Sequence, residues 1–62
     1  MTIAKYYIED TVTGDCLLND GEWAPFLPEN EHKEFTAFDD AVAEIDTLAE
    51  GTYRVFARFY KD

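Results

Sequence analysis

Few side chains in this sequence have the type and spacing needed for catalysis or metal binding. His32 is its one histidine, and charged residues flank it: Glu31, Lys33 and Glu34. A triad or a zinc site needs a nucleophile, a second imidazole or a cysteine cluster, and none of these lies near His32. We therefore predict a solvated loop residue. Cys16 has no CxxC partner and begins an apolar run, which predicts a small buried hydrophobic residue rather than a nucleophile.

Carboxylate pairs are the remaining catalytic candidates. The pairs Asp39/Asp40 and Glu29/Glu31 are close along the chain, but a helix start and a charged loop explain them more simply. A chain this short can hardly wall the cleft that a glycosidase-like carboxylate pair requires. The sequence has no glycine-rich phosphate loop and no calcium-binding loop pattern. We predict a protein that is not an enzyme and has no cofactor and no metal.

The charge distribution is a stronger functional clue. The 62 residues include 14 acidic and 5 basic ones, which gives a formal net charge of −9. Such a chain repels nucleic-acid phosphates and is attracted to basic protein surfaces. Solubility alone is the alternative explanation, because excess Asp and Glu prevent association. Many of the acidic residues fall on a predicted helix and just before it: Asp39, Asp40, Glu44, Asp46 and Glu50, with Glu29, Glu31 and Glu34 ahead of them.

These acidic residues are expected to form one negative ridge along the helix and its approach loop. Negative groups held on a folded surface can occupy the place of DNA phosphates on a basic partner, which is the physical content of DNA mimicry. An ordinary solvated helix face is the alternative. The ridge predicts a protein partner with a basic, nucleic-acid-binding surface and no direct contact with nucleic acid.

The last twelve residues, GTYRVFARFYKD, hold most of the positive charge. On a strand, four of them share one face: Arg54, Phe56, Arg58 and Tyr60. Arginine and aromatic residues are enriched at binding hot spots, so this face is a second candidate protein-binding surface. Single-stranded nucleic acid also stacks on such residues, but the net charge of −9 argues against that ligand.

A structural role for the same face is the alternative. The two arginines can pair across strands with Glu9 or Asp15, and the two aromatic rings can pack on Tyr7. The exposed sheet face or an edge strand can also join two copies of the chain. A structural or accessory module, as a homodimer, is therefore the alternative function.

Local patterns indicate the elements that position these residues. Residues 3–9 are β-branched and aromatic and predict a first strand. Asp20-Gly21 lies between apolar runs and predicts a hairpin with a two-residue type I′ turn. Residues 27–34 have no period and predict a loop. The alternating segment 52–61 predicts a last strand that lies beside the first, with Tyr53, Val55, Ala57 and Phe59 facing the core.

A helix is expected between the loop and the last strand. Thr36 is the predicted cap, with Asp39 as its capping-box partner, and Gly51 is the predicted left-handed residue after the last turn. Six apolar residues share one helical face: Phe38, Ala41, Val42, Ile45, Leu48 and Ala49. The expected fold is a single α+β domain, 1–62, in which a small antiparallel sheet of three to four strands has one amphipathic helix packed on one face, in the order β-β-(β)-α-β.

The expected location is the cytoplasm. The N-terminus lacks the basic region and apolar run of a signal peptide. No stretch approaches the length of a membrane span, so no membrane partner is expected.

Residues 35–60, FTAFDDAVAEIDTLAEGTYRVFARFY, resemble small phage-encoded proteins that bind and disable bacterial machinery. The shared pattern is an aromatic residue, a short acidic helix with alanines, a glycine, and an alternating strand with arginines. The small RNA polymerase inhibitor of podophages has this strand–strand–helix–strand order, and small acidic anti-CRISPR and other anti-defence proteins are similar in size and charge. The resemblance implies an inhibitor of a bacterial host protein in the host cytoplasm, with Arg54 and Arg58 in the positions of the arginines that contact the polymerase.

Overall fold

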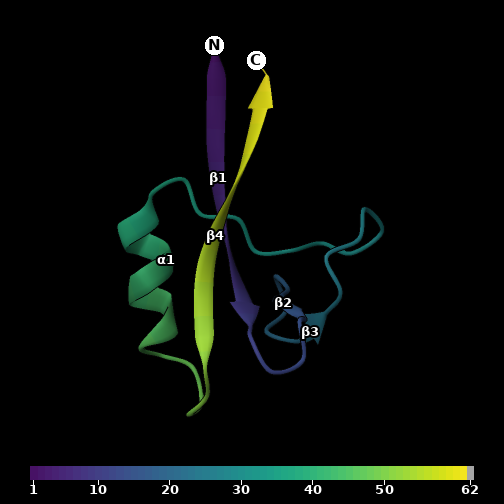
Figure 1. The fold of residues 1–62 in the computed structure, drawn as a ribbon, viewed down its shortest axis with the longest axis vertical. Coiled ribbons are helices and arrows are strands. Elements are labelled where there is room, and N and C mark those ends of the chain that lie inside the picture. Colours follow the sequence, from purple (N-terminus) through teal and green to yellow (C-terminus); the bar gives the residue numbers. More distant parts are fainter. Residues whose placement is uncertain (62) are drawn as a thin grey trace.

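The computed structural model of the protein describes residues 1–61 and contains four strands and one helix. In chain order these are β1 (Thr2–Asp10), β2 (Cys16–Leu17), β3 (Trp23–Ala24), α1 (Phe38–Ile45) and β4 (Tyr53–Lys61). The strands form one antiparallel sheet in the order β3-β2-β1-β4, and α1 lies on one side of it (Figure 1). The predicted α+β fold is confirmed, as is the pairing of the last strand with the first.

The core lies between α1 and the sheet. Its fully buried members are Ile8 of β1, Leu17 of β2 and Ala41 of α1. Partly buried apolar side chains surround them: Tyr6, Trp23, Phe35, Ile45, Leu48, Tyr53 and Val55. Each strand therefore contributes to one cluster under the helix, which explains why a helix of only eight residues can hold a four-stranded sheet together.

Phe59 is a correction to the predicted core. Its side chain is 70% exposed, although it lies on the same face of β4 as Tyr53 and Val55. The eight residues of α1 span about 12 Å, whereas the nine residues of β4 span about 30 Å. The helix is therefore too short to cover the C-terminal end of β4, and the strand pair extends beyond it at the top of Figure 1.

The predicted hairpin joins β2 to β3, but its turn differs from the predicted one. The amide of Leu18 donates to the Glu22 carbonyl at 2.8 Å, and the amide of Gly21 donates to the Leu18 carbonyl at 3.1 Å. This is a three-residue loop in which Gly21 alone takes a positive φ, of 89°. A type I′ turn would need a positive φ at Asp20 as well, a conformation that costs a residue with a Cβ more than it costs glycine.

The start of α1 is also a correction. The residue before the first helical turn is Ala37, and no side chain caps the helix there. The predicted capping box of Thr36 and Asp39 was therefore wrong. The acidic residues Asp39 and Asp40 do lie in the first turn, where a negative charge favours the positive end of the helix dipole.

The end of α1 comes earlier than predicted, at Ile45. Gly51 lies six residues further on and does not have a positive φ, so its predicted role as a helix terminator was wrong. A different constraint acts on it. A Cβ atom at position 51 would lie 2.8 Å from the Tyr53 hydroxyl oxygen, and that hydroxyl donates a 2.7 Å hydrogen bond to the Ala49 carbonyl.

Candidate functional site

A second side-chain cluster lies on the face of the sheet opposite α1, with Phe26 at its centre. The ring centroid of Phe26 is 4.8 Å from that of Tyr7 and 5.3 Å from that of Phe56. It is also 4.8 Å from the ring of His32, and the guanidinium of Arg58 lies 5.4 Å from it. These contacts hold the loop that follows β3 against the strand pair β1–β4.

Tyr7 is the buried polar group of this cluster. Its hydroxyl donates to Glu34 Oε2 at 2.7 Å and therefore accepts the 2.9 Å hydrogen bond from the Tyr60 hydroxyl. Burial, together with these hydrogen bonds to Tyr60 and Glu34, raises the pKa of the Tyr7 hydroxyl far above its ordinary value. Tyr7 consequently stays neutral and links β1, β4 and the loop.

A cleft of about 580 Å³ opens beside this cluster. Its walls are Tyr7, Asn19, Phe26, Leu27, Pro28, Asn30, Glu31, His32, Glu34, Arg58 and Tyr60. The volume lies within the range of about 300–1,000 Å³ that is typical of small-ligand sites. The prediction that so short a chain cannot wall a cleft was therefore wrong, because the loop after β3 folds back over the sheet and supplies one wall.

His32 is a further correction. Its side chain is buried, with 8% exposure, and Nε2 lies 3.3 Å from the Ala24 carbonyl oxygen. The predicted solvated loop residue was wrong because this segment pairs with the sheet: His32 forms an isolated bridge with Leu18, and Phe35 forms another with Tyr6. No alternation of polar and apolar residues marks this segment, so the sequence carries no signal for these contacts.

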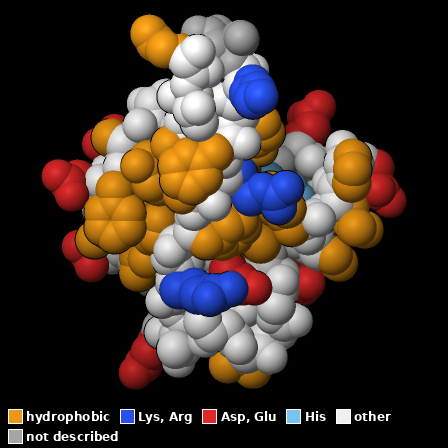
Figure 2. Space-filling view, turned by 45° about the horizontal axis from the view of Figure 1, so that its top comes forward, with side chains coloured by type: hydrophobic (Ala, Val, Ile, Leu, Met, Phe, Trp, Pro, Cys, Tyr) orange, Lys and Arg blue, Asp and Glu red, His pale blue; other side chains and the backbone are white. Residues whose placement is uncertain are grey.

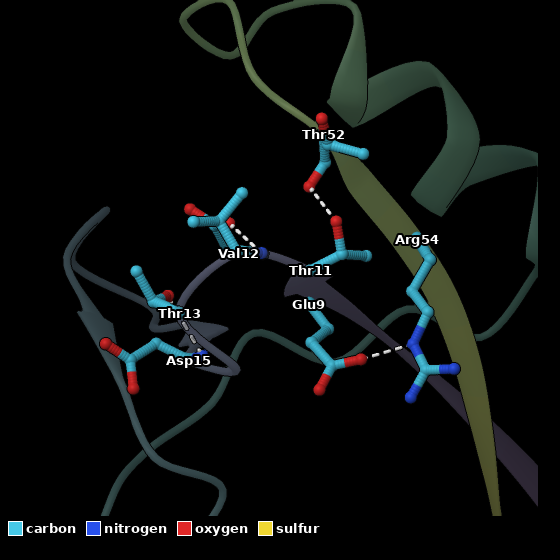
Figure 3. A network of polar contacts seen from close by, with 8 residues as sticks. Glu9, Thr11, Val12, Thr13, Asp15, Thr52 and Arg54 are labelled. Carbon is cyan, nitrogen blue, oxygen red and sulfur yellow. Dashed lines mark hydrogen bonds and ion pairs between the residues drawn. The ribbon is translucent and has the colours of Figure 1, made fainter.

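The arginine–aromatic face has mostly intramolecular partners. Arg54 Nε donates to Glu9 Oε1 across the β1–β4 pair, next to the Thr11–Thr52 hydrogen bond (Figure 3). The ring of Phe56 stacks on Tyr7 at 5.5 Å. The structural interpretation is thus confirmed for the pairing of Arg54 with Glu9 and for the packing of Phe56 on Tyr7. Tyr60 contacts Tyr7 through a hydrogen bond between the two hydroxyl groups.

Arg58 forms no ion pair within residues 1–61; its guanidinium lies over Phe26 instead. Its side chain is exposed and forms part of the wall of the cleft. Figure 2 shows basic side chains in a row down the middle of one side of the molecule, with hydrophobic side chains beside them. Most acidic side chains in this view lie around the rim, and some lie next to the lowest basic side chain. This side therefore differs in charge from the rest of the acidic surface.

The acidic residues of the helix segment are mostly unpaired. Asp39, Asp40, Asp46 and Glu50 are exposed, and none of them forms an ion pair with a residue of the described chain. Glu44 differs, because Lys33 Nζ lies 2.7 Å from its Oε2.

The predicted continuous ridge of helix and approach loop was wrong. The loop lies on the far side of the sheet from α1 (Figure 1), where Glu31 and Glu34 line the cleft. The exposed negative charge near the helix is therefore limited to α1 and the turns that follow it.

Cys16 is buried, as predicted, with 1% exposure. Burial, reinforced by the charges of Glu9 and Asp15, raises the pKa of its thiol to about 11 from 9.0. Because the folded state keeps the proton, the stability from the neutral thiol is complete below about pH 9 and is lost as the pH rises toward 11.

We expect the free energy of unfolding to fall by about 1 kcal/mol more between about pH 8 and 10 in the wild type than in Cys16→Ala. Urea titrations at a series of pH values measure the difference. The tyrosines titrate in both proteins, so parallel pH profiles would show that the thiol is not protected by burial.

No family model, curated protein or solved structure matches this chain. Within residues 1–61, no group of three or more His, Cys, Asp or Glu side chains is placed to hold a metal ion. In the same part of the chain, no helix has the length and apolar character to cross a membrane. A functional assignment therefore has to come from the acidic helix surface and from the face of β4.

Proposed function

We propose that this protein is a non-enzymatic binding protein of phage type, which inhibits a bacterial host protein by occupying its basic, nucleic-acid-binding surface. The contacting groups are the exposed acidic residues of α1 and the turns after it, here called the acidic helix surface: Asp39, Asp40, Asp46 and Glu50. The observation that carries the proposal is that these four exposed carboxylates lie within twelve residues of the chain and that none of them forms an ion pair with a described residue.

Three acidic residues outside this set have a basic partner. Lys5 lies 4.0 Å from Glu34, Arg54 pairs with Glu9, and Lys33 pairs with Glu44 at the inner flank of the helix. The acidic helix surface has no such compensation among the described residues. Its potential therefore extends into solvent, where it can attract a basic partner and raise the association rate.

The helix presents this charge on a rigid frame. Ala41 is fully buried in the core, and the Lys33–Glu44 pair ties the helix to the segment before it. Seven residues separate Asp39 from Asp46, which corresponds to about 10 Å along a helix axis. Three successive phosphate steps of one DNA strand advance by a similar length along the duplex axis, at about 3.4 Å per step. The spacing thus suits a basic surface that binds a phosphate backbone.

The test is competition with DNA. Proteins that bind heparin are enriched from a bacterial lysate, captured on the immobilised protein at low salt, and eluted with short duplex DNA. We expect DNA to release the captured protein, and we expect the triple variant Asp39→Lys, Asp40→Lys, Asp46→Lys to bind it at least about tenfold more weakly, a loss of about 1.4 kcal/mol or more.

The matched control is the triple variant Glu22→Lys, Glu29→Lys, Glu31→Lys. It changes the net charge equally, and all three residues are exposed on the hairpin and loop, away from α1. This control should retain most of the affinity at matched salt. If both variants lost the same affinity for the captured protein, the loss would be due to net charge alone. The acidic helix surface would then be ruled out as a specific phosphate mimic.

The second candidate function is a structural or accessory module that acts as a homodimer. The observation that favours it is the long edge of β4, which pairs with no other strand of the described chain.

A further inference from the structure

β4 is the outermost strand of the sheet and has one unpaired edge. Its inner edge pairs with β1 along nine residues, from Asp10↔Tyr53 to Thr2↔Lys61. In Figure 1, β4 crosses in front of β1, and α1 lies on the side of β4 away from β2 and β3. A long, open edge is a ready template for another strand, and natural proteins normally shorten, charge or cover such edges.

The backbone hydrogen bonds identify which residues of β4 face the open edge. Tyr6 exchanges both of its backbone hydrogen bonds with Phe35, on the side of β1 away from β4. The pair Tyr6↔Ala57 is therefore a non-hydrogen-bonded pair of the β1–β4 ladder, and the N–H and C=O of Ala57 point outward.

Hydrogen bonds at the other end of the β1–β4 ladder also place the odd-numbered residues of β4 at the open edge. The amide of Asp10 bonds to Asp15, away from β4, whereas the amide of Thr11 bonds to the Thr52 carbonyl. The outward-pointing set is thus the odd-numbered one, which includes Val55, Ala57 and Phe59. Their outward groups have no hydrogen-bond partner in residues 1–61.

A second copy of the chain can pair with this edge in several registers, and the one centred on Ala57, the midpoint of Tyr53–Lys61, pairs the whole of β4; centring on Val55 would pair only residues 53–57. In an antiparallel pair of identical strands, opposite residues must lie on the same face of the sheet. The two-fold axis therefore passes midway between the two copies of one residue, and each register is named by that central residue. Centring on Phe56 places Arg54 opposite Arg58, and centring on Arg58 places this arginine opposite itself. Both arrangements put like charges directly across from each other, which is unfavourable.

Centring on Ala57 avoids these clashes. On one face, Arg54 then lies opposite Tyr60 of the second copy and Arg58 opposite Phe56, so each arginine meets an aromatic ring. On the other face, Val55 lies opposite Phe59. Because Ala57 points its N–H and C=O outward, this register also makes the central pair a hydrogen-bonded one.

We propose that β4 pairs antiparallel with β4 of a second copy, centred on Ala57, to form one continuous sheet. Two further observations support this partner. Residues 53–61 contain no acidic side chain, so this edge is where two chains of net charge −9 can approach with least repulsion. Phe59, which is 70% exposed in the single chain, becomes covered by apolar surface.

Amide hydrogen exchange measured by NMR over a range of protein concentration tests the register directly. The inward amides of Arg54, Phe56 and Arg58 are bonded to β1 and should be protected at every concentration. The outward amides of Val55, Ala57 and Phe59 should exchange fast in dilute solution and become protected as the concentration rises. Sedimentation equilibrium should show a monomer–dimer transition over the same range, strengthened by salt because both copies are acidic.

Two variants test the edge, and one serves as the control. Ala57→Pro removes an outward N–H that the β1–β4 ladder does not use. Phe59→Lys leaves the backbone intact and places a charge at the apolar contact. Each should raise the dimer dissociation constant at least about tenfold without loss of the sheet by circular dichroism. Val12→Lys makes the same charge change at an exposed apolar residue of the β1–β2 turn and should dimerise normally.

Three outcomes would overturn the proposal. The first is a monomer at all concentrations, and the second is a dimer in which the outward amides stay unprotected, which would place the contact on another face. The third is protection that appears only when a different protein is added, which would assign the edge to a peptide segment of another partner. Unchanged dimerisation of Phe59→Lys would likewise exclude the Ala57-centred register.

Discussion

Replacing Ile8 with alanine is expected to lower the free energy of unfolding by about 2–4 kcal/mol. Ile8 is fully buried and contacts both the helix and the neighbouring strand through the core cluster with Leu17 and Ala41. A core in a domain of this size rarely supplies more than about 3–5 kcal/mol of net stability, so most of it would be lost. Urea unfolding followed by the fluorescence of Trp23, which stacks on Tyr53 at 5.4 Å, measures the change.

Ile3→Ala is the matched control for this prediction. Ile3 lies on the same strand but on the opposite face from Ile8, and it is 42% exposed. It should lose about 1 kcal/mol or less, and Ile8→Val should fall between the two. If Ile8→Ala and Ile3→Ala were equally destabilised, the cluster under α1 could not be the main core.

Replacing Phe26 with alanine is expected to destabilise the protein by about 2 kcal/mol and to remove the cleft. Its ring contacts Tyr7, Phe56 and His32, and it is the main apolar anchor of the loop after β3. The loop should then separate from the sheet while the core under α1 persists. Amide hydrogen exchange at Lys33, whose N–H bonds to the Leu17 carbonyl, and chemical denaturation measure the two effects.

Leu27→Ala is the control, because Leu27 is the next residue and is 46% exposed. It should change stability by less than about 1 kcal/mol and leave the amide exchange of Lys33 as in the wild type. Wild-type amide exchange at Lys33 in Phe26→Ala, together with wild-type stability, would show that the bridge of His32 to Leu18 holds the loop without the ring.

The two proposed surfaces are physically separable. Binding through the acidic helix surface should weaken with salt, because it depends on opposite charges, whereas pairing of β4 edges should strengthen with salt, because both copies are negative. A two-fold axis perpendicular to the sheet would place both helices on the same face of the joined sheet. A dimer would then present two acidic helix surfaces on one face. This arrangement would suit a partner protein that binds both strands of a nucleic-acid duplex.

Local patterns predicted the fold well, since the information they carry is short in range. The period-two alternation of residues 53–60 identified β4 and its two faces, and the apolar spacing from Phe38 to Ile45 identified α1. Cys16 was predicted to be buried from its place in an apolar run, and it is. Both charged faces were also recognisable, because net charge and its position along the chain are properties of the sequence.

The sequence by itself determined the class of the fold, the pairing of β4 with β1 and the two candidate surfaces. The tertiary structure alone decided which residues of these surfaces are exposed and free of intramolecular ion pairs, and can therefore contact a partner. Contacts between residues far apart in the chain determine three features: the burial of His32, the ion pair of Arg54 with Glu9, and the exposure of Phe59. So does the cleft beside Phe26, whose wall is a loop that no local period describes. The physical reason is that periodicity reports which side of an element faces inward, whereas exposure and pairing depend on how far the neighbouring element extends.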